Sequence, residues 1–131
     1  MSNENIGIHH IAIAASDFEK SMKFYTEGLG FRQTAAWGEG EKRAALLDIG
    51  NGSCIELFAN GTAEEPKHSR IRHIAFATDN PDSAFDRAVK AGAAPHVEPK
   101  DVTIQSDPVM PVRLAFVKGP DGELLEFFCE K

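Results

Sequence analysis

The chain has 131 residues, 42% of them hydrophobic and 26% charged, and its formal net charge is −6 at pH 7. This length and composition are typical of one globular domain with a buried core. The acidic balance, without a basic stripe, argues against nucleic-acid binding, and no apolar run approaches the roughly 20 residues that span a bilayer. We therefore expect an enzyme or a binder of a small-molecule ligand, with no nucleic-acid or membrane partner.

The cellular compartment is predicted from the start of the chain and its cysteines. The first five residues lack the basic start and apolar run of a secretion signal. Cys54 and Cys129 lie in strand-like segments, where small buried thiols are expected. We therefore expect a cytoplasmic protein with both cysteines reduced.

The first half of the chain is predicted to form a strand, a helix and three more strands. Residues 8–15 alternate as a strand does, with His10, Ala12 and Ala14 on one side. Asp17 then resembles a helix N-cap, ahead of apolar residues at helical spacing. The apolar residues of the predicted helix are Phe18, Met22, Tyr25 and Leu29. The three strands that follow are predicted over 32–37, 43–49 and 54–59.

The second half is predicted to repeat this order after a polar linker that contains Pro66. A strand over 71–77 leads to Asn80 and Pro81, which are typical of a helix start, and Gly92 ends that helix. Four prolines make residues 94–111 the least regular stretch, with 99–111 as a connector or a lid. Two further strands are predicted over 112–118 and 123–129.

The two halves also repeat in sequence. The strand from Ile8 to Ala14 returns from Ile71 to Ala77, and the segment 52–58 returns as 122–128. Such repeats determine the architecture. We predict an α+β fold of two tandem βαβββ modules, whose curled mixed sheet surrounds a metal-binding cleft. The chain 1–131 is predicted to be a single domain. Its first module covers about residues 7–60, the linker about 61–70 and the second module about 71–130.

Both copies keep a histidine and a glutamate within strand-like segments. A lone strand histidine or glutamate is more often an ordinary core or surface residue, and a buried carboxylate is costly without a partner. Recurrence in both halves favours a ligand set instead, since two imidazoles and two carboxylates suit a borderline divalent cation. The predicted ligands are His10, Glu56, His73 and Glu126. We expect one ion, with nickel, zinc or cobalt preferred and manganese or iron as alternatives.

The other histidines lack this support, and His9, His68 and His96 are predicted to be structural or exposed. His9 faces the helix side of its strand by alternation, whereas His68 and His96 fall in predicted loops. Phe116 could line a cleft or belong to the core.

These residues, with the run from His10 to Asp17, Phe24-Tyr25, and 119–122 ahead of Glu126, resemble the vicinal oxygen chelate superfamily over about residues 7–130. This superfamily contains the glyoxalase, bleomycin-resistance and dioxygenase proteins. The order His, Glu, His, Glu is similar to that of glyoxalase I (lactoylglutathione lyase).

The resemblance implies a metal-dependent glyoxalase I-like lyase or isomerase. It would act by metal-assisted proton transfer on a small oxygen-chelating substrate such as a hemithioacetal. Glu126 is then the preferred catalytic base, and Glu56 could serve the opposite enantiomer. Many relatives are homodimers, so a homodimer is expected.

The resemblance leaves the substrate and two other functions open. One alternative is an epimerase of the same superfamily, although epimerases usually have glutamine where this chain has Glu56. The other alternative is a non-catalytic protein that binds a small molecule or confers resistance to it. Asn60 matches a glyoxalase I substrate contact, whereas Ala14 stands where an arginine usually helps to hold glutathione, so another thiol is possible. Arg70, Arg72 and Arg113 could supply compensating charge, although ordinary exposed arginines are the commoner explanation. Phe58 and Phe128 share the strand face of the glutamates and are the further candidate substrate contacts.

Overall fold

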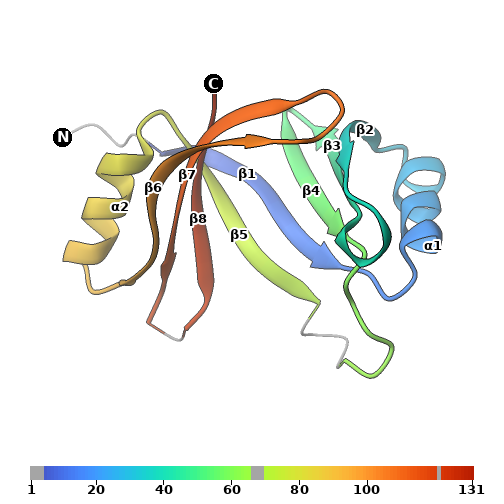
Figure 1. Ribbon diagram of the computed structural model, residues 1–131, viewed down its shortest axis with the longest axis horizontal. Helices are drawn as coiled ribbons and strands as arrows, with labels where there is room; N and C mark the ends of the chain where they lie inside the picture. Colours follow the sequence, from blue (N-terminus) through green and yellow to red (C-terminus); the bar gives the residue numbers. More distant parts are fainter. Residues whose placement is uncertain (1–4, 66–69, 121) are drawn as a thin grey trace. The chain divides into compact units, whose positions relative to one another are not determined.

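The computed structural model describes residues 5–65, 70–120 and 122–131 (Figure 1). Pro66, His68 and most of the second half of the predicted linker lie outside the described residues. The chain forms two compact units, divided within β1 and β5. The first unit comprises residues 10–72 and 105–109, and the second comprises residues up to 9, 73–104 and 110–131.

The first unit contains the βαβββ order predicted for the first half of the chain. Its strand order is β2-β3-β4-β1, with β1 parallel to β4 and the other pairs antiparallel. The Asp17 side chain caps α1 by accepting a hydrogen bond from the Lys20 N–H at 3.1 Å, as predicted. The elements are β1 (Asn5–Ala14), α1 (Phe18–Lys23), the π-helix η1 (Phe24–Gly28), β2 (Arg32–Trp37), the 3-10 turn η2 (Gly40–Lys42), β3 (Ala44–Gly50) and β4 (Ser53–Phe58).

The helical stripe of this unit ends earlier than its spacing predicts. Phe18 is buried among Ala45, Leu47 and Leu57, and Met22 and Tyr25 pack against the same cluster. Leu29, in contrast, is 50% exposed. The wider winding of η1 breaks the 3.6-residue spacing that would have kept Leu29 on the buried side, so its prediction as part of the stripe was wrong.

The second unit is a second βαβββ arrangement, so the predicted fold class is confirmed. Its strand order is β5-β8-β7-β6, with β5 parallel to β8. The elements are β5 (Ile71–Thr78), α2 (Pro81–Lys90), β6 (Ala94–Ile104), β7 (Met110–Lys118) and β8 (Leu124–Glu130). Figure 1 shows α2 beside these strands.

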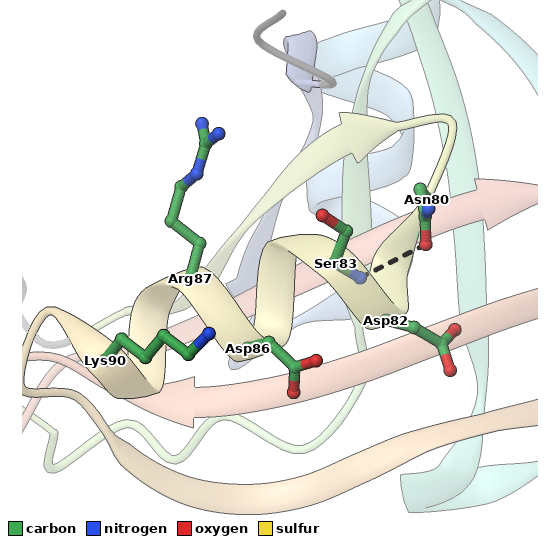
Figure 2. Close-up of a pocket in the computed structure, with 6 residues that line it drawn as sticks. All are labelled: Asn80, Asp82, Ser83, Asp86, Arg87 and Lys90. Atoms are coloured by element: carbon green, nitrogen blue, oxygen red, sulfur yellow. Dashed lines mark hydrogen bonds between the residues drawn. The ribbon is translucent and has the colours of Figure 1, made fainter. Parts of the chain in front are cut away.

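Helix α2 starts where its capping residues predict. The Asn80 side chain accepts a hydrogen bond from the Ser83 N–H at 3.1 Å, drawn as a dashed line in Figure 2. Pro81 follows at the first helical position. The buried face of the helix carries Ala84 and Phe85, which pack against strand residues in a core of Ala115, Val117 and Phe127.

The prediction of an irregular stretch over residues 94–111 was wrong. Most of it is the long strand β6, and only 105–109 connect β6 to β7. Proline is tolerated here because β6 is the outermost strand of its unit and pairs with β7 through two register shifts near Pro95 and Pro99. His96 therefore lies in a strand and not in a loop.

The connector between β6 and β7 is attached to the first unit. The Asp107 N–H donates a hydrogen bond to the Ala36 carbonyl of β2 at 2.7 Å, and the two residues form an isolated bridge. Ser106 is buried, and its hydroxyl donates to the Pro108 carbonyl at 2.7 Å. These contacts fit an ordered connector better than a mobile lid.

The exposed side of α2 forms a shallow surface depression, shown in Figure 2. None of its lining residues is among the candidate site residues of the sequence. They are Asn80, Asp82, Ser83, Asp86, Arg87 and Lys90. Among the described helices, none has the length and apolar character that crossing a membrane requires.

The contrast between Leu57 and Leu29 can be tested by truncation. Leu57 has no exposed surface, so Leu57→Ala should leave a cavity and lower the free energy of unfolding by about 2–5 kcal/mol. Leu29→Ala removes the same atoms from an exposed position and should change it by less than about 0.5 kcal/mol. Urea unfolding of both variants measures the difference, and equal losses would contradict the exposed position of Leu29.

A surface ion cluster around Arg113 should make stability depend on acid pH. Arg113 donates to Asp82 at 2.6 and 2.8 Å and to Asp101 at 3.1 Å, and these hydrogen bonds hold the pKa of both carboxyls below the usual range. Because the folded pKa values are the lower ones, the stabilisation is complete above the unfolded value of about 4 and is lost as the pH falls further.

The measurement is the urea midpoint of wild type and Arg113→Gln between pH 7 and pH 2.5. The difference in urea midpoint between wild type and Arg113→Gln should become smaller below about pH 4. Arg32→Gln, which removes an exposed arginine 3.4 Å from Asp48, serves as the control and should show a smaller gap. A gap for Arg113→Gln that stays constant with pH would refute the electrostatic origin.

Candidate functional site

The first unit brings His10 of β1 and Glu56 of β4 together. The His10 Nε2 lies 3.3 Å from the Glu56 Oε1, and the two residues are only 1% and 8% exposed. In the parallel pairing of β1 with β4, Glu56 lies opposite Ala12, two residues beyond His10. The small Ala12 side chain leaves the space above the strand to the imidazole and the carboxylate.

The second unit repeats this arrangement with His73 of β5 and Glu126 of β8. The His73 Nε2 lies 3.1 Å from the Glu126 Oε1, and the side chains are 11% and 4% exposed. Glu126 lies opposite Ala75, again an alanine two residues beyond the histidine in a parallel pair. The sequence repeat is therefore also a repeat of register and of side-chain contact.

In each unit the pair lies on the sheet face that points away from the helix. Along a strand, successive side chains alternate between faces. In the first unit, Ile13 and Leu57 pack into the cluster around α1, so His10 and Glu56 take the opposite face. In the second unit, Phe76 and Phe127 pack against α2, and His73 and Glu126 lie opposite.

The donor chemistry of both pairs fits a divalent metal ion. A buried imidazole and carboxylate can satisfy each other by a hydrogen bond, and they can equally offer one nitrogen and one oxygen to a cation. Nitrogen with oxygen is the mixture that nickel, zinc, cobalt, manganese and iron accept, whereas magnesium and calcium prefer oxygen alone. Two such pairs in equivalent positions together offer two nitrogen and two oxygen atoms as possible metal ligands.

The predicted substrate-contact residues occupy different environments. Phe58 ends β4 and is half-buried, and Asn60 follows it at an exposed position. Phe128 is only 4% exposed, and its ring centroid lies 4.3 Å from that of His9. Phe58 and Asn60 are thus accessible to a ligand, whereas Phe128 belongs to the packed interior of its unit.

His9 is structural, as expected from its lack of a repeated partner. It is buried, and its Nε2 lies 2.7 Å from the Glu130 Oε2. Its ring packs on Phe128, which shares the strand face of Glu126. The sequence contains no periodic signal for this contact, because the two strands concerned lie at opposite ends of the chain.

The arginines considered as compensating charges already have carboxylate partners. Arg72 Nη2 donates to both oxygens of Glu65 at 2.8 and 2.7 Å, and Arg70 lies 3.7 Å from the same carboxylate. The hydrogen bond from Arg72 is the main cause that lowers the pKa of Glu65. Arg113 is engaged by two aspartates in the same way. Much of the positive charge of these arginines is therefore balanced within the protein.

Two further residues lie next to the pair of the second unit. Phe116 of β7 is the register partner of Glu126, and its ring lies 5.5 Å from that of His73 at 89°. His96 of β6 contacts the same Phe116 ring, at 6.5 Å and 84°. The sequence pattern predicts a loop at His96, and nothing in it indicates the strand irregularity that brings His96 to Phe116.

Comparison with known proteins is consistent with this geometry. The family model described as "Glyoxalase/Bleomycin resistance protein/Dioxygenase superfamily" matches residues 7–127. The chain is 36% identical over 127 residues to "Uncharacterized protein YwkD" of Bacillus subtilis (strain 168), covering 92% of this chain and 94% of the relative. It is 34% identical over 139 residues to a "Probable lactoylglutathione lyase" of Vibrio parahaemolyticus, covering 100% of this chain and 94% of that one.

Among solved structures, the methylmalonyl-CoA epimerase of Mycobacterium tuberculosis has the same fold. The TM-score is 0.74 at 18% identity, and the match covers 100% of this chain and 92% of the epimerase. That identity establishes the fold alone. With its nearly full-length family match, its duplicated βαβββ modules and its repeated His/Glu pairs, the chain belongs to the glyoxalase/bleomycin resistance protein/dioxygenase superfamily.

Proposed function

We propose that His10, Glu56, His73 and Glu126 together hold one divalent metal ion, and that the protein is a metal-dependent lyase or isomerase of the glyoxalase I type. The observation that carries this proposal is the recurrence of one buried His/Glu pair at the same register in both units. Membership of a superfamily that includes lyases and epimerases supports it. Nickel, zinc and cobalt are the ions we would test first.

Two observations favour a glyoxalase I type of reaction over epimerisation. The second position of the ligand set is Glu56, a carboxyl group where epimerases usually have an amide, and it pairs with His10 in the way that Glu126 pairs with His73. In addition, the relative named a probable lactoylglutathione lyase is 34% identical over the whole chain, whereas the compared methylmalonyl-CoA epimerase structures are 16% to 24% identical.

The proposed reaction moves a proton between two neighbouring carbons of the substrate. When bound, the metal ion would supply Lewis-acid stabilisation of negative charge on two adjacent substrate oxygens. The Glu126 carboxylate removes the proton from the carbon that carries the hydroxyl and the sulfur, and the electron pair left behind moves onto the neighbouring carbonyl oxygen. Glu126 then returns the proton to the former carbonyl carbon, while the hydroxyl proton passes to the former carbonyl oxygen, so that the first carbon becomes the thioester carbonyl. His73, 3.1 Å away, restrains the orientation of the carboxylate.

The surroundings suit Glu126 to this role. It is 3% exposed, with Phe116 opposite it on β7 and Phe128 on the same strand face. Apolar neighbours exclude water from a developing carbanion and reduce competing proton exchange. Glu56 has the equivalent position in the first unit, and we propose that it serves the opposite substrate enantiomer.

The remaining parts of the proposal concern substrate contacts and assembly. Asn60 and Phe58, both accessible at the end of β4, are the proposed contacts to the polar and apolar parts of the substrate. Phe128, which is buried in its own unit, is the third residue of the proposed substrate site. We propose a homodimer acting in the cytoplasm on a small-molecule substrate.

The metal proposal predicts about one divalent ion per chain in purified protein incubated with nickel, cobalt or zinc. His10→Ala and His73→Ala should each lower the bound metal strongly, because each removes a nitrogen donor. His96→Ala, which removes an exposed histidine outside the ligand set, is the matched control and should leave the metal content unchanged. Elemental mass spectrometry measures all four proteins, and a wild type that takes up no ion would refute the site.

The catalytic proposal predicts that Glu126→Gln lowers the rate of hemithioacetal isomerisation by about 10²- to 10⁴-fold, the usual contribution of a general base. Much of the metal should remain, because the amide keeps an oxygen donor. Glu56→Gln tests the equivalent carboxylate of the first unit and should affect the two enantiomers unequally. Loss of metal in parallel with loss of rate would make Glu126 a ligand only.

The reaction type can be read from solvent exchange in deuterated water. Hemithioacetals of a 2-oxoaldehyde with glutathione or with another thiol should be converted to thioesters, with deuterium entering in proportion to solvent access. Interconversion of the two epimers of a 2-methyl thioester, without any hemithioacetal turnover, would instead identify an epimerase.

A further inference from the structure

An extra residue in β6 determines where His96 points. In the pairing with β7, Pro95 lies opposite Val117 and Val97 lies opposite Phe116, so His96 is inserted between two consecutive register positions. A single-residue bulge of this kind redirects a side chain that regular alternation would send to the other face. Pro95 and Pro99 flank the bulge on the outermost strand of the unit.

The bulge brings a second imidazole, that of His96, to the phenyl ring that His73 contacts. The His96 and His73 rings lie 6.5 and 5.5 Å from the Phe116 ring, and both are nearly perpendicular to it. Phe116 in turn lies opposite Glu126. The proposed catalytic base, the phenyl ring and His96 thus follow one another across three adjacent strands, β8, β7 and β6.

This row of residues becomes more exposed toward its outer end. Glu126 is buried, Phe116 is half-buried and His96 is exposed. On the same face, partly buried apolar side chains continue the surface around Phe116: Val97, Val102, Ile104 and Met110. A small molecule that reaches Glu126 would therefore meet an apolar surface and then an imidazole that both donates and accepts hydrogen bonds.

We propose that Phe116 and His96 form a substrate-binding strip beside Glu126. The strip binds a substrate that has an aryl or branched alkyl group next to its oxygen pair. This apolar group packs on Phe116, and a polar atom at the far end of the group forms a hydrogen bond with His96. The inference rests on the proposed function for the position of the oxygen pair. The contacts of Phe116 with His96 and His73, which form the strip, do not depend on that proposed function.

The test compares two metal-chelating probes that share an oxygen pair and differ in the attached group. Benzohydroxamate carries a phenyl ring and acetohydroxamate a methyl group. The wild type should bind benzohydroxamate about three- to tenfold more tightly than acetohydroxamate, the effect expected of one aromatic contact. Binding is titrated by NMR in metal-loaded and metal-free protein, and the preference should appear in both, at lower affinity without the ion.

Phe116→Leu keeps an apolar side chain and the fold but should remove most of the preference for the phenyl group. Phe24→Leu changes an exposed phenylalanine of η1 and is the matched control, which should keep the preference. The imidazole signal of His96, assigned with His96→Ala, should shift on addition of 4-hydroxybenzohydroxamate, whose ring hydroxyl supplies the polar atom beyond the phenyl group. His96→Ala should raise KM for a turned-over substrate several-fold, with metal content unchanged.

The outcomes separate the strip from the function on which it rests. Equal binding of the two probes in both protein states, or a preference unaffected by Phe116→Leu, would overturn the strip even if the protein binds metal and turns over substrate. A preference that depends on Phe116 in a protein that takes up no metal would support the strip and overturn the proposed metal chemistry. An unshifted His96 signal would remove His96 from the strip.

Discussion

The parallel pairing of one strand couple in each unit is the constraint on which the candidate site depends. In β1 with β4, and in β5 with β8, an alanine lies opposite a glutamate, and a histidine precedes that alanine by two residues. Since residues two apart share a strand face, the imidazole and the carboxylate are brought to within 3.3 Å in one unit and 3.1 Å in the other. A change of register by one residue would move these side chains to the opposite face.

The same alternation divides stability from chemistry. The helix-facing side of each sheet holds apolar clusters, around Leu47 and Leu57 in the first unit and around Ala115 and Val117 in the second. The opposite face buries ionisable groups, which lower stability unless they are paired. Pairing within each unit offsets this cost, and it leaves the same donors available for a cation. This is the combination expected where a stable scaffold carries a reactive site.

The two units differ in their outermost strands, and the proposed strip of Phe116 and His96 includes the outermost strand of the second unit. β6 is longer than its counterpart β2 and contains two register shifts, whereas β2 has one. The bulge at His96 places an imidazole near the phenyl ring that faces Glu126. A duplication that keeps its His/Glu pairs can thus differ on one side, since an outer strand accepts insertions and prolines with little effect on the core.

The sequence by itself determined the duplicated βαβββ order, the caps at Asp17 and Asn80 and the four candidate ligands. These follow from strand alternation, from helical spacing and from hydrogen bonds between near neighbours, all of which are local. Only the tertiary structure decided that Leu29 is exposed, that the proline-rich stretch is a strand and that His96 contacts Phe116. Each of these depends on helix winding or on register with a distant strand, and such contacts leave no periodic trace in the sequence.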